Sequence, residues 1–348
     1  MPCSLLLVAI GLASFVGPTF AAPRGVKGEW VTTSVFVSAT PTDKAAVSSI
    51  FATFTHSKGA AILSVPVPAG RTSKPSGTLS LDSTFIYDLD NGPIGAPDFK
   101  SKSGVGIDAS VYIFDLVRLE VDQIKAYKDA GKTAICYFSA GSLDPLRADA
   151  GNFDDACVCG TGGTLDSSNH CTGGDPNAKQ KNWDQYWLDI HSPACKTNVR
   201  AAMTKRLQMA KEKGCDGIDP DNVDSYMNGA PHGNTEADQM EYLLWLSETT
   251  HAQGLLINLK NGAGLLRAGH AQELVSAFDF SVVESCHVYD ECQVYEPFLA
   301  AGKPMIQIEY SNSITKCPTL KPGQNLAVLS GLTLNSAQIT LDCPAPRG

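Results

Sequence analysis

The 348-residue sequence has comparatively few basic residues: 27 Lys and Arg stand against 36 Asp and Glu, which gives a formal net charge of −9. An acidic chain argues against nucleic acids and anionic membrane surfaces as partners. It is compatible with a cationic substrate, although many exported proteins are acidic for solubility alone.

Long hydrophobic runs are also missing. The run from Leu5 to Val16 is shorter than the roughly 20 apolar residues that a membrane-spanning helix needs. Small residues follow at Thr19 and Ala21, so residues 1–21 read as a signal peptide, although a basic segment before the run is lacking. We therefore expect a secreted, extracellular and monomeric protein without a membrane partner.

No nucleotide-binding glycine motif follows any predicted strand, which argues against a dinucleotide or P-loop site. From about residue 80, short apolar strands alternate with helical patterns, and this alternation is typical of a parallel sheet. About eight repeats fit a (β/α)₈ TIM barrel, an α/β fold, better than an open doubly wound sheet. The predicted strands are Phe85–Leu89, Val111–Asp115, Thr133–Ser139, Cys215–Asp221, Leu255–Leu259, Phe280–Glu284, Met305–Glu309 and Leu326–Leu329, and the predicted helices are Val121–Ala130, Val199–Lys213, Glu236–Gln253 and Ala271–Ala277.

The barrel domain is expected over residues 79–348, after an N-terminal extension and linker over residues 22–78. The stretch from Pro66 to Ser76 is rich in proline and poor in apolar residues, as linkers are. The extension can either pack on the main domain or form a small hairpin, and the sequence does not choose between them.

Ten of the 11 cysteines lie beyond the predicted signal peptide, and an even, high count in an exported protein favours disulfides over metal. Four of them lie close together: Cys157, Cys159, Cys171 and Cys195. They predict an insertion between Asn152 and Cys195 that is stapled by disulfides, with a zinc site as the alternative. Cys286 and Cys292 are close enough to bridge a short loop, whereas Cys136 is either a buried thiol or half of a bridge. We expect no metal and no other cofactor.

Ionisable residues stand at successive strand ends, where TIM barrels carry their functional side chains. They are Asp115, Asp219, Asp221, Lys260, Glu284 and Glu309. Glycosidic bonds are hydrolysed by two carboxyl groups on opposite sides of a sugar, and the strands of Asp221 and Glu284 flank that of Lys260. The alternatives are a helix cap for Asp221 and a surface position for Lys260.

Five segments in this order resemble glycoside hydrolase family 114, the endo-α-1,4-polygalactosaminidases and their relatives, from about residue 80 to residue 310. They are Ala-Ile-Cys-Tyr-Phe-Ser-Ala-Gly-Ser (134–142), Trp-Leu-Asp-Ile (187–190), Gly-Cys-Asp-Gly-Ile-Asp-Pro-Asp-Asn-Val-Asp-Ser-Tyr (214–226), Leu-Lys-Asn (259–261) and Val-Glu-Ser-Cys-His-Val-Tyr-Asp-Glu-Cys (283–292).

The resemblance implies a TIM barrel and a retaining mechanism in which Asp221 is the nucleophile and Glu284 the acid/base. It also implies that further side chains line the cleft and bind substrate: Asp115, Tyr137, Ser139, Asp216, Lys260 and Glu309. We assign Asp219 to the cleft lining as well. The family usually has Glu where this chain has Asp219, and Leu146 stands near the place of a usual Trp. The first strand also lacks the usual tryptophans.

We therefore predict a secreted, endo-acting, retaining glycosidase that hydrolyses an α-1,4-linked, galactosamine-containing polysaccharide, whose cationic chain would suit an acidic cleft. Two alternatives are a non-catalytic carbohydrate-binding barrel and a glycosidase for another α-linked glycan.

Overall fold

The computed structural model describes residues 31–39, 47–56, 59–65, 79–89, 109–310, 314–332, 334, 338–344 and 346. The chain divides into two units, residues 1–72 and 73–348. In the first unit, β1 (Val31–Ala39), β2 (Val47–His56) and β3 (Gly59–Val65) form an antiparallel sheet in the order β1-β2-β3. The predicted signal peptide and the linker from Pro66 to Ser76 lie outside the described residues.

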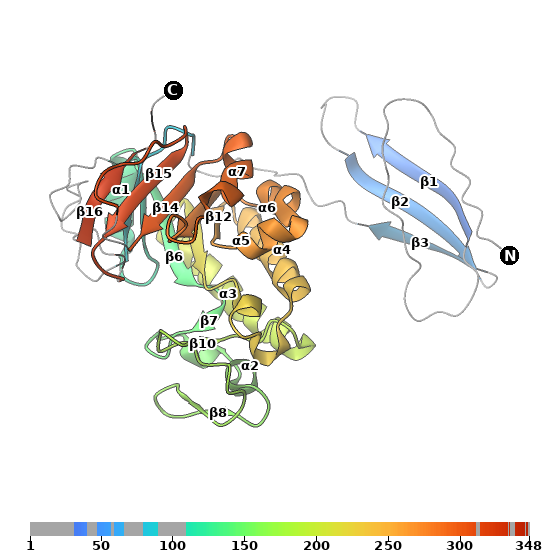
Figure 1. Ribbon diagram of the computed structural model, residues 1–348. Helices are drawn as coiled ribbons and strands as arrows, with labels where there is room; N and C mark the ends of the chain where they lie inside the picture. The colour runs from blue at the N-terminus through green and yellow to red at the C-terminus, as the bar shows by residue number, and fades with distance from the viewer. Residues whose placement is uncertain are drawn as a thin grey trace. The chain divides into compact units, whose positions relative to one another are not determined.

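The second unit is built on a curled, nine-stranded sheet in which eight strands run parallel (Figure 1). In sheet order from one end, its members are β4 (Phe85–Asp88), β5 (Val111–Asp115), β6 (Thr133–Ser139), β11 (Gly217–Asp221), β12 (Leu256–Lys260), β13 (Phe280–Glu284), β14 (Met305–Glu309), β15 (Gln324–Leu329) and β16 (Ile339–Cys343). Only β16 is antiparallel to its neighbour. All eight predicted strands are therefore confirmed, and the architecture is a mixed α/β fold of the TIM-barrel type.

Helices connect the consecutive parallel strands from β5 to β14, as is usual in βαβ units. They are α1 (Val121–Asp129), α3 (Pro193–Lys213), α4 (Glu236–Ala252), α5 (Ala263–Leu265), the π-helical turn Leu266–His270, α6 (Ala271–Ala277) and α7 (Glu296–Ala300). Helix α3 begins six residues before its predicted start, because Pro193 occupies its first turn, where the missing N–H costs nothing. None of the described helices combines the length and apolar character of a membrane crossing.

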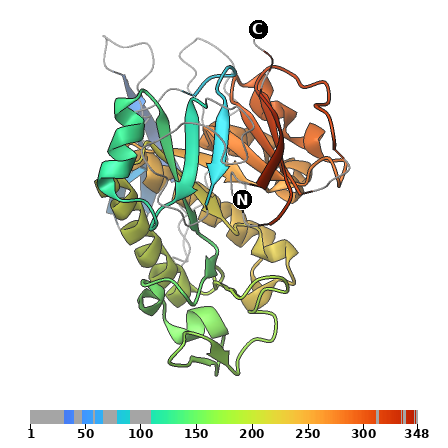
Figure 2. The same ribbon diagram turned by 90° about the vertical axis from the view of Figure 1, so that its left-hand side faces the viewer.

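The first and last parallel strands of the sheet approach each other (Figure 2). The Asn325 side chain of β15 donates to the Ser83 carbonyl oxygen just before β4, at 3.0 Å. The Leu89 amide just after β4 donates to the Leu334 carbonyl oxygen, at 2.7 Å. No β-ladder joins β4 to β15 or β16 among the described residues, so the curled sheet is held together at these ends by individual hydrogen bonds.

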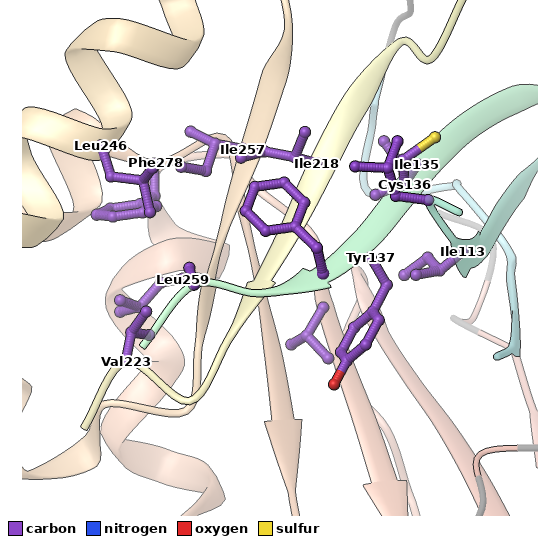
Figure 3. Packing of buried hydrophobic residues seen from close by; sticks show 14 of the residues in the cluster. Ile113, Ile135, Cys136, Tyr137, Ile218, Val223, Leu246, Ile257, Leu259 and Phe278 are labelled. Atoms are coloured by element: carbon purple, nitrogen blue, oxygen red, sulfur yellow. The ribbon is translucent and has the colours of Figure 1, made fainter. Parts of the chain in front are cut away.

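The core lies on both faces of the sheet, which explains why its strands read as nearly continuous apolar runs. Figure 3 shows Ile218 and Ile257 of adjacent strands, with Leu246 of α4 and Phe278 beside Ile257. Tyr137 belongs to the same buried cluster, but its hydroxyl oxygen points away from these residues.

The insertion between β6 and α3 is stapled, as expected. Disulfides join Cys157 to Cys195 and Cys159 to Cys171, and a further bridge joins Cys286 to Cys292. The insertion also contains α2 (Asp155–Cys159) and the two-residue strands β8 (Thr164–Leu165), β9 (Cys171–Thr172) and β10 (Tyr186–Trp187), the last paired with β7 (Ser142–Leu143). Two further bridges lie outside the insertion. Cys136–Cys215 joins neighbouring strand segments of the sheet, and Cys317–Cys343 lies near the C-terminus.

Candidate active site

Asp221, Lys260 and Glu284 meet at the carboxyl ends of β11, β12 and β13. The ammonium Nζ of Lys260 lies 3.3 Å from Asp221 Oδ1 and 3.5 Å from Glu284 Oε2. The two distances limit the separation of these oxygens to about 6.8 Å, a bound that includes the roughly 5–5.5 Å of retaining pairs and only the lower end of the roughly 6.5–9.5 Å range of inverting pairs. The Lys260 side chain is buried, while both carboxylates keep some exposure, so solvent and substrate reach the acids and not the amine.

The charge of Lys260 is held in place by its surroundings. Burial alone lowers the pKa of Lys260, but the facing carboxylates of Asp221 and Glu284 outweigh burial and raise it well above its ordinary value. The rings of Tyr87 and Tyr137 lie within cation–π distance of the ammonium, at 5.4 and 5.8 Å. Lys260 is therefore a permanent positive charge between two acids, and its predicted surface alternative is wrong.

Each carboxylate also accepts a hydrogen bond from a tyrosine. Tyr137 donates to Asp221 Oδ2 at 2.9 Å, and burial together with the negative charge of Asp221 raises the pKa of Tyr137. Tyr310 donates to Glu284 Oε1, while Asn261 donates to Glu284 Oε2 at 3.2 Å. Sequence reasoning missed Tyr310 and Asn261 as site residues, although each directly follows a residue that it had assigned to the site.

Asp219 does not line the cleft as expected, because its side chain is fully buried. It accepts hydrogen bonds from Tyr87, and from the Asn258 side chain at 2.6 Å. The Tyr87 hydroxyl in turn lies 3.4 Å from the Lys260 ammonium. Burial, partly offset by Lys260, raises the pKa of Asp219 to about 7. Asp219 therefore holds the Tyr87 hydroxyl beside the Lys260 ammonium. Because Asp219 is fully buried, a substrate cannot reach it.

Asp224, two residues beyond the motif's Asn222, is a fourth acid that was not assigned a role from the sequence. Burial and then the negative charge of Asp221 raise the pKa of Asp224 to about 6. Asp221 and Glu284 thus share one positive charge, with Asp219 and Asp224 as buried acids nearby, and the surroundings favour a cationic ligand.

Asp115 and Ser139 lie at the rim but are engaged in protein contacts. Asp115 forms a two-pronged ion pair with Arg147, and Ser139 Oγ accepts from the Asn222 side chain at 3.0 Å. A pocket beside Tyr137 is lined by both of them and by Asp144, Arg147 and Gln185. The structure thus keeps these two predicted residues next to the site: Ser139 is the ladder partner of Asp221 on the adjacent strand, but no described side-chain hydrogen bond or ion pair joins either residue to Asp221 or Glu284.

Asp216 lies at the wrong end of the sheet to bind substrate. It precedes the first residue of β11, whereas Asp221 ends that strand, and it pairs with Lys128 at 2.9 Å. Because the strand is extended, the two aspartates are separated by its whole length, roughly 16 Å. The expectation that Asp216 lines the cleft is therefore corrected.

Glu309 ends β14, as predicted, but its carboxyl group is fully buried. Its Oε1 accepts the His287 amide hydrogen at 2.8 Å. Burial raises the pKa of Glu309. The residue therefore anchors the segment that follows Glu284 instead of facing the cleft.

Among the described residues, the one grouping of potential metal ligands is Cys286, His287 and Cys292. Both cysteines are joined in a disulfide, so neither offers a thiolate. This donor set does not fit a metal ion.

The chain matches the model of glycoside hydrolase family GH114 over residues 69–337. Among solved structures, Ega3 from Aspergillus fumigatus, crystallised in complex with galactosamine, aligns at 26% identity and a TM-score of 0.57, over 79% of this chain and 100% of that one. The glycoside hydrolase domain of PelA from Pseudomonas aeruginosa aligns at 17% identity and a TM-score of 0.48, over 75% of this chain and 98% of that one. No curated protein sequence matches the chain significantly.

Proposed function

The chain belongs to glycoside hydrolase family GH114, and from that premise we propose that it is an endo-acting, retaining hydrolase of α-1,4-linked, galactosamine-containing polysaccharide. The observation that carries the proposal is the short bridge from Asp221 through the Lys260 ammonium to Glu284. Two partly exposed carboxylates that share one ammonium group can lie at the roughly 5–5.5 Å of a retaining pair, a separation that suits direct attack on the sugar.

In the proposed mechanism, an Asp221 oxygen forms a bond to the anomeric carbon as the bond to the leaving oxygen breaks. Glu284 passes its proton to that leaving oxygen. In the second step Glu284 takes a proton from water, the water oxygen bonds to the anomeric carbon, and Asp221 leaves as a carboxylate. Tyr137 and Lys260 orient Asp221, while Tyr310 and Asn261 orient Glu284.

The substrate proposal rests on the negative charge of the site and on the structural similarity of the chain to Ega3. The partly exposed carboxylates of Asp221 and Glu284 share the single Lys260 ammonium, and the resulting excess of negative charge attracts the ammonium group of a deacetylated amino sugar. Ega3, to which the chain is similar, was crystallised with galactosamine. A cationic polymer is accordingly the expected partner.

We extend the proposal to the whole chain. The hydrogen bonds that join the two ends of the sheet support a closed (β/α)₈ barrel, with domain limits at residues 79 and 348. Five disulfides support a secreted, extracellular protein, since such bridges persist in oxidising surroundings. Residues 1–21 would be its signal peptide and residues 22–78 its extension and linker, and the mature protein would be a monomer.

The test separates the two carboxylates by role. Asp221→Ala should abolish turnover on every substrate, because no covalent intermediate forms. Glu284→Ala should lose activity on partly deacetylated galactosaminogalactan, whose leaving group needs a proton, but should still react with an activated aryl glycoside. Added azide should then raise turnover of that variant, because azide attacks the intermediate without a general base.

Asp129→Ala is the matched control, since Asp129 is an exposed aspartate of α1. Products of the wild-type reaction are identified by mass, and the anomer first released is followed by NMR. Inversion at the anomeric carbon would refute the retaining mechanism, and activity only on a polymer without galactosamine would refute the substrate.

A further inference from the structure

The loop of residues 286–292, the Cys286–Cys292 loop, begins two residues after Glu284 and is pinned at several points. The disulfide closes it. The His287 amide donates to the buried Glu309, and the His287 ring bonds Gln307 Oε1 through Nε2 at 2.6 Å. The Glu291 amide donates to the Cys286 carbonyl oxygen at 2.8 Å. The backbone of the loop is therefore fixed relative to β14, next to the catalytic pair.

This fixed loop nevertheless presents two large apolar side chains to solvent. Val288 is 56% exposed and Tyr289 is 70% exposed. The Tyr289 amide donates to the carbonyl oxygen of Ser285, the residue directly after Glu284, at 3.1 Å. The backbone of Tyr289 is thus hydrogen-bonded to the residue that follows the proposed acid/base.

The short disulfide does little for the overall fold. Bridges stabilise mainly by restricting the unfolded chain, and the effect grows with the length of the closed loop. The sequence separation is 6 for Cys286–Cys292 and 79 for Cys136–Cys215. The main consequence of the shorter bridge is local: it holds the backbone that carries Tyr289 in place before any ligand arrives, so binding costs less conformational entropy.

The charge around Tyr289 matches the proposed substrate. Asp290 is exposed beside it, and Glu291 forms an ion pair with Arg267 at 3.1 Å. An aromatic face attracts a cation within about 6 Å of the ring centre, and an adjacent carboxylate strengthens that attraction. Apolar C–H groups of a sugar ring can pack on the same face.

We propose that Tyr289, with Asp290, forms an outer sugar-binding subsite, which holds an ammonium-bearing residue of the glycan beyond the bond that is cleaved next to Glu284. The inference rests on the proposed function. It explains how a cleft with few aromatic residues at its predicted positions retains a long chain during endo-cleavage: the missing platform is supplied by the disulfide-closed loop.

The experiment compares chain lengths. Tyr289→Ala, Tyr289→Phe, Asp290→Asn and wild type are assayed on deacetylated galactosamine oligosaccharides of increasing length, and on an aryl glycoside too short to reach the loop. Tyr289→Ala should raise KM about tenfold on the long oligosaccharides, and leave kcat/KM on the aryl glycoside unchanged. Tyr289→Phe keeps the ring and should behave as wild type. Asp290→Asn should raise KM on deacetylated chains but not on fully acetylated ones, since only the former carry ammonium groups.

The outcomes separate this inference from the proposed function. If wild type cleaves the oligosaccharides and Tyr289→Ala shows no change that depends on length, the subsite is refuted while the proposed function stands. An equal loss on the aryl glycoside would assign Tyr289 to the positioning of Glu284 and refute the subsite as well. If wild type neither cleaves nor binds these oligosaccharides, both proposals fail. Circular dichroism and thermal unfolding confirm that each variant is folded, as exposed substitutions should be.

Discussion

Asp219→Asn should change how the stability of the protein depends on pH. In the native protein the pKa of Asp219 is raised from 3.8 to about 7, mainly by burial. Between these two values the folded state holds a proton that the unfolded state has lost, so wild-type stability falls as pH rises through this range. Below about pH 4 both states are protonated and the contribution vanishes; above about pH 7 the full cost is present. The substituted amide carries no charge at any pH.

The size of the effect follows from the displacement of the pKa. Each pH unit corresponds to about 1.4 kcal/mol, so the displacement from 3.8 to about 7 costs about 4 kcal/mol above pH 7. The amide preserves the packing. The amide oxygen accepts the hydrogen bond from Tyr87. The NH₂ group donates to Asn258 Oδ1 once the Asn258 amide has rotated so that its oxygen and nitrogen exchange places. In the wild type, Asn258 Oδ1 is a buried acceptor without a hydrogen bond. The main change is therefore the loss of a titrating group.

Urea unfolding of wild type and Asp219→Asn, with disulfides intact, from pH 4 to pH 8 measures the difference directly. The stability of the variant relative to wild type should rise by about 4 kcal/mol across this range. Asp224 and Asp342, whose pKa values are raised to about 6 and about 7, titrate in both proteins and cancel. If the free energies of unfolding of the two proteins differed by the same amount at every pH, Asp219 would not hold a proton near neutral pH. The argument that burial raises its pKa would then fail.

Three further outcomes follow from individual contacts. Tyr310→Phe removes a hydrogen bond to Glu284 and should lower kcat on the polymer roughly 10- to 100-fold with little change in KM; an unchanged kcat would contradict the orienting role. Replacing Cys136 and Cys215 by serine opens the bridge with the largest sequence separation and should lower the free energy of unfolding by about 4 kcal/mol, which equal urea midpoints would disprove. Asp216→Asn should lower stability by about 1 kcal/mol and leave kcat unchanged, because the residue pairs with Lys128 at the opposite end of β11; loss of activity in a stable variant would return Asp216 to the site.

The strand-and-helix order and the position of the candidate site were predictable from the sequence, because both depend on local patterns. A buried parallel strand is a short, mainly apolar run, and here an ionisable residue stands at its carboxyl end. That rule found Asp221, Lys260 and Glu284, and these three side chains do come together. The stapled insertion was predictable for a similar reason: four closely spaced cysteines in a stretch poor in apolar residues have few partners other than one another.

The direction and depth of each side chain were decided only by the tertiary structure. Asp219 and Asp221 are two residues apart on one strand and belong to the same face, yet one is fully buried and the other partly exposed. What separates them is their position along the strand, because Asp219 is enclosed by Tyr87 of β4 and by Asn258 of the adjacent strand β12. Asp216 shares their motif but precedes the strand, so it pairs with Lys128 of α1, a helix more than 80 residues earlier. Such pairings between distant segments depend on how strands and helices pack, and no local pattern in the chain encodes them.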